Sequence, residues 1–325
     1  MSELPVIFSI EQARQSGMTD AAIYHAVARR RLVRVRKGMY CTADTWHRSA
    51  GSVVARHALE ARAGWLSLGR RGWASHYTAA LLSELPVPLG QPDLVTLSQA
   101  NRSGGRRMYQ PGLRLRTATV DPRDVGAEWG MAVLSSARTA LDVARTHGFA
   151  AGLVLADAAL GRAVATTDDL SRIATTMVGW NSAAARLVAR HASALRESPI
   201  ESCSYALFVE RDLPLPECNQ WVVGEGRGGV RSDFFWKAYR LAGEADGQVK
   251  YTEPFSEPVT VLVDEKSRQL RIEESGLVVV RWTGAEILHH PDRVIDRIVR
   301  QSRIASAMYG VPVLLPGGAS ARWAS

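Results

Sequence analysis

Three carboxylates, Asp233, Glu244 and Asp246, lie at a spacing that could hold a metal ion. Asp233 lies in the strand candidate Val230–Trp236, which is rich in β-branched and aromatic residues. Glu244 lies near the end of a second short strand candidate, Tyr239–Ala245, and Asp246 follows directly. If Lys237-Ala238 forms a two-residue hairpin turn, Asp233 pairs with Ala242, and the strand period of two places all three carboxylates on one face. Carboxylates gathered on a mostly apolar hairpin are costly to desolvate, so they favour a bound cation, and oxygen ligands suit Mg²⁺ or Mn²⁺.

An alternative without a metal stays open. Asp246-Gly247 also fits a turn after a strand, and Asp233 also fits an exposed strand residue, because most carboxylates are simply solvated. Lys250 follows one short turn later and could supply a further positive charge.

A fourth carboxylate, Glu201, stands at the start of a predicted helix. Ser198 fits the N-cap, Pro199 the first helical position and Glu201 the third, which is the pattern of a capping box. Glu201 therefore either serves only to start this helix or turns toward the metal as a further ligand.

The stretch around these carboxylates resembles a known nuclease family. Arg-x-Asp-Phe at 231–234, followed by Glu-x-Asp-Gly-x-x-Lys-Tyr at 244–251, is similar to the domain related to very-short-patch repair endonucleases, within the PD-(D/E)xK superfamily. The resemblance covers roughly residues 197–300 and implies a restriction-endonuclease-like α/β/α domain with Mg²⁺ as cofactor. It implies Glu201, Asp233 and Glu244 as metal ligands. The superfamily's lysine two residues after the second acid is replaced by Asp246 here, which leaves open whether Lys250 takes its place.

Composition indicates a multidomain protein of the reducing cytoplasm. The 325 residues suffice for two or three domains, no apolar run approaches the length of a membrane span, and the N-terminus lacks a signal-peptide pattern. The three cysteines, Cys41, Cys203 and Cys218, show no metal-ligand spacing and no even pairing.

The charge distribution favours nucleic-acid binding by the front of the chain. The net charge is +8, but 36 of the 40 basic residues are Arg, which a GC-rich genome also produces. Residues 1–130 hold 18 basic and 10 acidic residues, whereas residues 197–300 hold 13 basic and 18 acidic. The excess positive charge therefore lies where contact with a polyanion is expected.

The first 45 residues predict a winged helix-turn-helix. Ser9 with Gln12 forms a capping box for a first helix, and Thr19 caps a second helix that we expect to run through Arg31. Residues 32–40 then alternate apolar and basic and turn at Lys37-Gly38, as a basic hairpin or wing does.

In such a domain the second helix enters the major groove and the wing contacts phosphates. The alternative is a small helical subdomain whose arginines are merely solvated. The helix residues expected to reach base edges are Tyr24, His25 and Arg29, and the wing residues expected at phosphates are Arg34, Arg36 and Lys37.

This first segment resembles the N-terminal domain of AbiEi-type antitoxins. The resemblance rests on Leu-Val-Arg-Val-Arg-Lys-Gly-Met-Tyr at 32–40, and it continues at 75–82, 134–142 and 157–160, which we interpret as packing signatures. It implies repression of the protein's own operon and neutralisation of a nucleotidyltransferase-type toxin. Because such repressors often bind palindromic DNA, we expect a homodimer.

We expect an α+β protein, and two hypotheses about its function stay open. The predicted domains are a winged helix-turn-helix at 1–45, a mixed, mostly helical antitoxin-like middle domain at 46–196, a nuclease-like domain at 197–309 and a flexible tail at 310–325. One hypothesis is a DNA-binding regulator of antitoxin type. The other is a Mg²⁺-dependent DNA endonuclease with Asp233, Glu244, Asp246 and Lys250 at its catalytic site.

Overall fold

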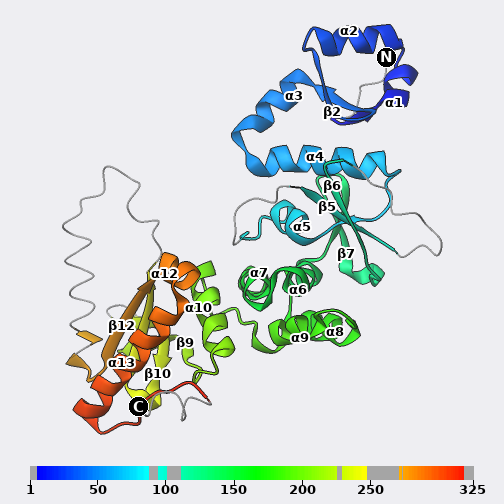
Figure 1. Cartoon of the computed structure of the whole chain (residues 1–325). Coiled ribbons are helices and arrows are strands. Elements are labelled where there is room, and N and C mark those ends of the chain that lie inside the picture. The colour runs from blue at the N-terminus through cyan, green and yellow to red at the C-terminus, as the bar shows by residue number, and fades with distance from the viewer. Residues whose placement is uncertain are drawn as a thin grey trace, which may run out of the picture. The chain divides into compact units, whose positions relative to one another are not determined.

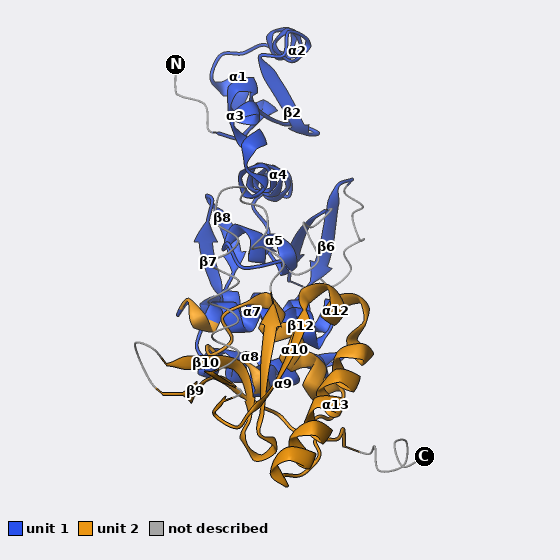
Figure 2. Ribbon diagram, turned by 90° about the vertical axis from the view of Figure 1, so that its left-hand side faces the viewer, with its two compact units in different colours: residues 1–159, 163–190 blue, residues 160–162, 191–325 orange. Residues whose placement is uncertain are grey.

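The computed structural model describes residues 6–87, 94–100, 111–224, 229–246, 271–272 and 274–317. The chain folds into two compact units, coloured separately in Figure 2. Unit 1 comprises Met1–Ala159 and Ala163–Arg190, and unit 2 comprises Leu160–Arg162 and His191–Ser325. Helices and three separate sheets make up the described residues, which confirms the predicted α+β class. The division of residues 1–196 into a winged domain and a middle domain stays a prediction.

Unit 1 begins with helix-turn-helix and hairpin elements (Figure 1). They are β1 (Phe8–Ser9), α1 (Ile10–Gln15), α2 (Asp20–Ala28), β2 (Leu32–Arg36) and β3 (Met39–Thr42). The three strands pair antiparallel in the order β1-β3-β2. Both helices start as predicted: Ser9 and Gln12 form a complete capping box, and the Thr19 hydroxyl accepts a hydrogen bond from the Ala22 N–H at 3.2 Å.

The second helix is shorter than predicted, since α2 ends at Ala28 and not at Arg31. Arg30 takes the left-handed conformation at φ +54°, and the Arg31 N–H bonds the Ala26 carbonyl at 2.8 Å. This is a Schellman-type helix stop with arginine where glycine is usual. The early stop lets Leu32 enter β2 as a buried residue.

The rest of unit 1 combines a five-stranded sheet with helices. Its elements are α3 (Ala43–Arg48), a 3-10 turn η1 (Ser49–Gly51), α4 (Val53–Ser67), β4 (Trp73–Ala74), α5 (His76–Leu82), β5 (Val95–Gln99), β6 (Leu113–Thr117), η2 (Pro122–Asp124), β7 (Val125–Glu128), β8 (Met131–Leu134), α6 (Ser136–His147), α7 (Phe149–Gly161), α8 (Thr167–Thr176) and α9 (Ser182–His191). The strand order is β6-β5-β4-β8-β7, with β5–β6 and β4–β8 parallel. Small residues of α4, Ala58 and Ala61, pack against Val95, Leu97 and Val133 of the sheet.

Helices α6 and α7 approach closely at a glycine. A Cβ at Gly152 would lie 2.4 Å from the Ala144 Cβ and 2.9 Å from the Ala140 carbonyl oxygen. Only a residue without a side chain fits this crossing, so Gly152 fixes how near the two helices come.

Unit 2 is a four-stranded mixed sheet with helices. Its elements are α10 (Pro199–Glu210), β9 (Glu217–Val223), β10 (Val230–Trp236), a 3-10 turn η3 (Lys237–Tyr239), β11 (Leu241–Asp246), β12 (Val278–Thr283), α12 (Gly284–His289) and α13 (Pro291–Tyr309). The order is β12-β11-β10-β9; β11 and β12 run parallel and the other neighbours antiparallel. The core is an aromatic cluster in which the rings of Phe208, Phe234, Trp236 and Trp282 lie 5.2–6.2 Å apart.

Two predictions for the C-terminal part need correction. The sequence pattern of residues 286–307 predicts a single closing helix, but the structure divides this segment into α12 and α13. Pro291 cannot continue a helix and excludes the helical conformation at His290, whose φ is −139°. The tail expected to be flexible from residue 310 is ordered over 311–317. There Leu314 is fully buried, and its N–H bonds the Ser302 hydroxyl at 3.1 Å.

Two further expectations concern helices. The acidic-to-basic charge pattern of residues 264–274 predicts a helix, most of which lies outside the described residues. Over the ranges that the structure describes, none of the helices has both the length and the apolar character needed to cross a bilayer.

Candidate nucleic-acid interface and carboxylate cluster

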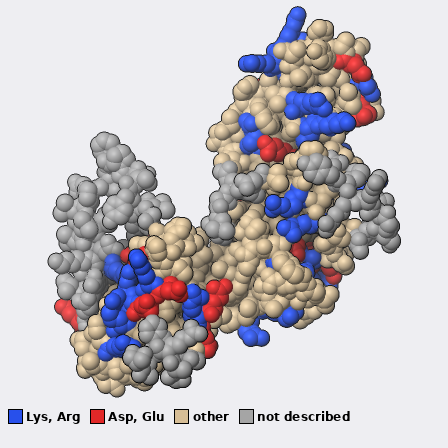
Figure 3. Space-filling model, viewed as in Figure 1, with Lys and Arg blue, Asp and Glu red and all other residues tan. Residues whose placement is uncertain are grey.

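The outer face of α2 carries the side chains predicted to read DNA. The helical period turns Ile23 and Ala26 into the core, which leaves Tyr24, His25 and Arg29 exposed, with Tyr24 at 73%. Lys and Arg side chains protrude from the N-terminal part of unit 1 in Figure 3. A large aromatic ring, an imidazole and a guanidinium on one exposed helix face can all contact base edges.

An exposed ion pair links α1 to the start of α2. Arg14 donates from Nε and Nη2 to the two carboxylate oxygens of Asp20, both at 2.8 Å. The hydrogen bond from Arg14, followed by its charge, lowers the pKa of Asp20. Because both groups are exposed, the pair contributes little stability, but its two-pronged geometry orients the helices.

Two cations of the wing are exposed, and a third is engaged in a hydrogen bond. Arg34 and Lys37 are exposed, and Gly38 at φ +76° completes the turn beside Lys37. Arg36 is half-buried, and its Nη2 donates to the Pro111 carbonyl at 2.7 Å. Burial lowers the pKa of Arg36, with Glu60 opposing this effect. Arg34 and Lys37 are therefore the wing residues better placed for phosphates.

In unit 2 the register between β10 and β11 differs from the predicted one, but Asp233 and Glu244 still lie on the same face of the sheet. Phe235 and not Asp233 pairs with Ala242, because η3 and Arg240, at φ +48°, make the connection four residues long. The shift is two residues, so the period of two returns the same side chains to the same face. Continued by one pair, this register sets Asp233 opposite Glu244.

Glu201 is held at the start of α10. Its Oε1 accepts from the Ser198 hydroxyl at 2.7 Å, and its Oε2 accepts from the Glu197 N–H at 2.9 Å and from Asn219 Nδ2 at 3.1 Å. Burial is the largest cause of its raised pKa, and the charge of Asp233 raises it further. Glu201 and Asp233 are thus near enough to interact, while both Glu201 oxygens already have donors.

The remaining predicted ligands are also partly engaged. Asp233 Oδ2 accepts from the Ala245 N–H at 2.8 Å, Glu244 is 3% exposed, and Asp246 is half-buried at the end of β11. Lys250 lies outside the described residues. Within the described ranges no three or more His, Cys, Asp or Glu side chains are grouped to hold a metal ion. The Mg²⁺ site stays a prediction.

The sequence reasoning missed a buried ion pair in unit 1. Arg138 Nε lies 3.1 Å from Asp142 Oδ2, and both side chains are 6% exposed. The segment 134–142 was interpreted as packing only. The spacing was the available signal, since an Arg and an Asp four residues apart lie on the same helix face, and such residues are seldom buried unless paired.

The winged segment is similar to a known family. Residues 3–43 match the family described as "Transcriptional regulator, AbiEi antitoxin". The AbiEi match spans β1 to β3 and confirms the predicted resemblance for that segment. The chain is also similar to two uncharacterized proteins of Mycobacterium tuberculosis, from strains CDC 1551 and H37Rv. Each is 29% identical over 200 residues, which cover 59% of this chain and 72% of the relative.

Proposed function

We propose that the protein is a DNA-binding transcriptional regulator of antitoxin type. The observation that carries the proposal is the AbiEi match over residues 3–43, on a segment whose α2 exposes Tyr24, His25 and Arg29. Hydrophobic packing leaves these side chains outward, and the basic wing follows directly in the chain. A helix with an exposed polar face and a flanking basic hairpin is suited to duplex DNA.

The two elements would divide the work of binding. Helix α2 would lie in the major groove, where Arg29 can make a two-pronged contact with guanine and Tyr24 and His25 can contact neighbouring bases. Arg34 and Lys37 would neutralise phosphates and set the register without reading sequence. Base reading by the helix and positioning by the wing are then separable by mutation.

The proposal includes a protein partner, a DNA target and an oligomeric state. A nucleotidyltransferase-type toxin is the proposed protein partner, the protein's own operon is the proposed target, and a homodimer is the proposed form on a palindromic site. The cytoplasm is the compartment in which such a repressor meets its DNA.

The test is binding of duplex DNA from upstream of the protein's own gene, followed by footprinting. We expect protection of a defined site, and we expect Tyr24→Ala and Arg29→Gln each to cost about 1–3 kcal/mol of discrimination against unrelated DNA. Arg186→Gln, an exposed arginine of α9, is the matched control and should bind like the wild type. Equal affinity of wild type and α2 variants for specific and unrelated DNA would contradict the proposal.

A Mg²⁺-dependent DNA endonuclease is the second candidate. It is favoured by the register that sets Asp233 opposite Glu244, with Glu201 close enough for its pKa to respond to Asp233. Glu201, Asp233 and Glu244 would hold the metal, and Asp246 and Lys250 would take part in catalysis. A bound Mg²⁺ would supply an activated water and positive charge.

Nicking of supercoiled plasmid in Mg²⁺ or Mn²⁺ tests the endonuclease. Asp233→Asn and Glu244→Gln keep the side-chain shape and should abolish metal-dependent nicking. Asp292→Asn changes an exposed carboxylate of α13 and should leave it intact. If wild type is as inert as both variants while binding DNA equally, the carboxylates are structural.

A further inference from the structure

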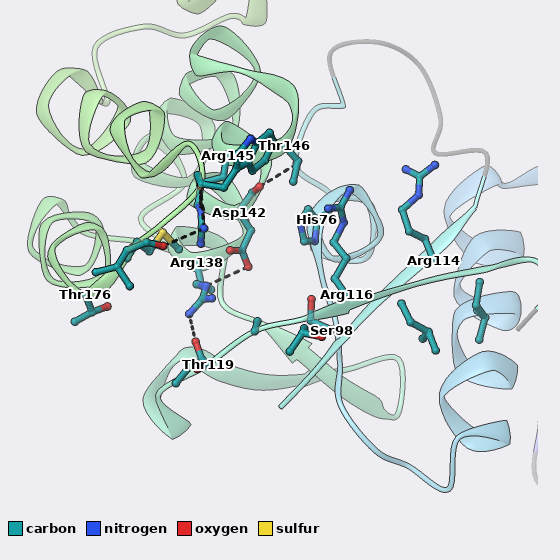
Figure 4. Close-up of a pocket in the computed structure, with 17 residues that line it drawn as sticks. His76, Ser98, Arg114, Arg116, Thr119, Arg138, Asp142, Arg145, Thr146 and Thr176 are labelled. Atoms are coloured by element: carbon teal, nitrogen blue, oxygen red, sulfur yellow. Dashed lines mark hydrogen bonds and ion pairs between the residues drawn. The ribbon is translucent and has the colours of Figure 1, made fainter. Parts of the chain in front are cut away.

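Unit 1 contains an arginine-lined cavity that DNA binding by α2 does not use. Its volume is about 910 Å³, in the range of small-molecule sites. Figure 4 shows Arg114 and Arg116 facing it from β6, with Arg138 and Arg145 on α6 at the other side. Asp142 is the one carboxylate among the described residues that line it, so three formal positive charges are in excess.

The two β6 arginines point to an anionic ligand. Because they are two apart on a strand, their side chains lie on the same face of β6. Arg116 Nε is buried and has no hydrogen-bond partner among the described residues. Arg114 is exposed and also has no partner there. A buried guanidinium N–H without an acceptor is costly, and a bound anion would satisfy it.

The α6 arginines build the opposite wall. Arg138 is clamped between Asp142 Oδ2 at 3.1 Å and the Thr119 carbonyl at 2.9 Å. Arg145 donates to the carbonyls of Val178 and Trp180 at 3.0–3.2 Å. These two side chains are fixed by the protein itself, so they shape the cavity and leave Arg114 and Arg116 as the binding groups.

His76, which lines the cavity, has an unusual backbone conformation. It takes φ +54°, a conformation disfavoured for a residue with a side chain, at the first position of α5. Its ring is buried beside the cavity, with Nδ1 3.0 Å from the Ser75 hydroxyl. Burial, aided by nearby positive groups, lowers its pKa to about 3. His76 is therefore neutral at ordinary pH and adds no charge to the site.

Trp180, in the connection between α8 and α9, also lines the cavity. Trp180 is 68% exposed, although large apolar side chains usually find cover. The loop is held by the three hydrogen bonds from Arg145 and by Asn181 Nδ2, which donates to the Arg145 carbonyl at 2.9 Å. An exposed indole held beside excess positive charge is a platform on which a planar ring can stack.

We propose that this cavity binds a nucleotide, with its phosphates on Arg114 and Arg116 and its base against Trp180. Free guanidinium groups suit phosphate oxygens, and the indole suits the heterocycle. Phosphate alone would not use Trp180, and a nucleoside alone would not use the arginines. Both features together select a ligand that carries both groups.

Titration calorimetry of the full-length protein tests the proposal with nucleoside triphosphates, pyrophosphate and nucleosides as separate probes. We expect at least one triphosphate to bind more tightly than pyrophosphate or its nucleoside. Arg114→Gln and Arg116→Gln should each weaken it by about tenfold or more. Trp180→Ala should weaken the nucleotide and leave any pyrophosphate binding unchanged. Arg186→Gln, outside the cavity, is the control, and thermal unfolding of each variant verifies that unit 1 is folded.

Three results would overturn the nucleotide assignment. One is no binding of any triphosphate up to about 1 mM. Another is pyrophosphate binding as tightly as the triphosphates with no effect of Trp180→Ala. The third is a loss of duplex DNA binding in Arg114→Gln and Arg116→Gln without small-molecule binding, which would make the cavity part of a nucleic-acid surface.

Discussion

His57 shows how one buried residue ties stability to pH. It is 7% exposed, its Nε2 lies 2.9 Å from the Thr78 hydroxyl, and burial lowers its pKa to about 4 from an ordinary 6.5. The folded protein therefore resists a proton that the unfolded chain accepts. Its contribution to stability is complete above about pH 6.5 and is lost as the pH falls toward 4.

We expect this loss to amount to about 1 kcal/mol per pH unit for His57. Urea unfolding of the protein, followed between about pH 7 and about pH 4.5, measures it. His57→Gln retains a polar partner for Thr78 and should show a shallower decline than the wild type. Parallel declines in the two proteins would contradict the assignment.

Residue faces were predictable from sequence, whereas residue partners were not. The outward position of Tyr24, His25 and Arg29 follows from the helical period, and the shared face of Asp233 and Glu244 follows from the strand period. Their partners depend on distant chain. No local pattern connects Arg36 with the Pro111 carbonyl, 75 residues away.

At the scale of elements, the α6–α7 crossing gives a test of packing against propensity. Gly152→Ala favours the helix intrinsically, yet its methyl group would overlap Ala144, so we expect a destabilisation of about 1–3 kcal/mol. Gly51→Ala is the control, because a Cβ there meets nothing within 4 Å, and it should change stability by less than about 0.5 kcal/mol. Denaturant unfolding measures the free energy of unfolding of both variants. A Gly152→Ala variant more stable than the wild type would contradict the close approach of α6 and α7.

Elements with strong local signals were predictable from sequence. Side-chain caps at Ser9, Thr19 and Ser198 mark helix starts, and all three are confirmed. Strands β4, β7 and β8 were missed because two to four residues are too short to show alternation, and sheet pairing stabilises them instead. The four-residue connection after Trp236 was missed because it lacks a glycine that would mark the left-handed Arg240.

At the scale of the whole molecule, the distribution of charge was predictable from the sequence, whereas the cavity was not. The basic excess of residues 1–130 was readable from composition and agrees with the proposed DNA surface. The arginine-lined cavity was not readable from the sequence, because it joins β6, α6 and the α8–α9 connection, which are spread between Leu113 and Trp180.

The most direct test of the regulator proposal is the salt dependence of duplex DNA affinity for the full-length protein. Counterion release predicts a linear fall of log affinity with log salt, and Arg34→Gln and Lys37→Gln should each reduce the slope by about 0.9. Arg186→Gln should leave the slope unchanged. An affinity insensitive to salt, or slopes identical in wild type and wing variants, would contradict DNA binding through the winged helix.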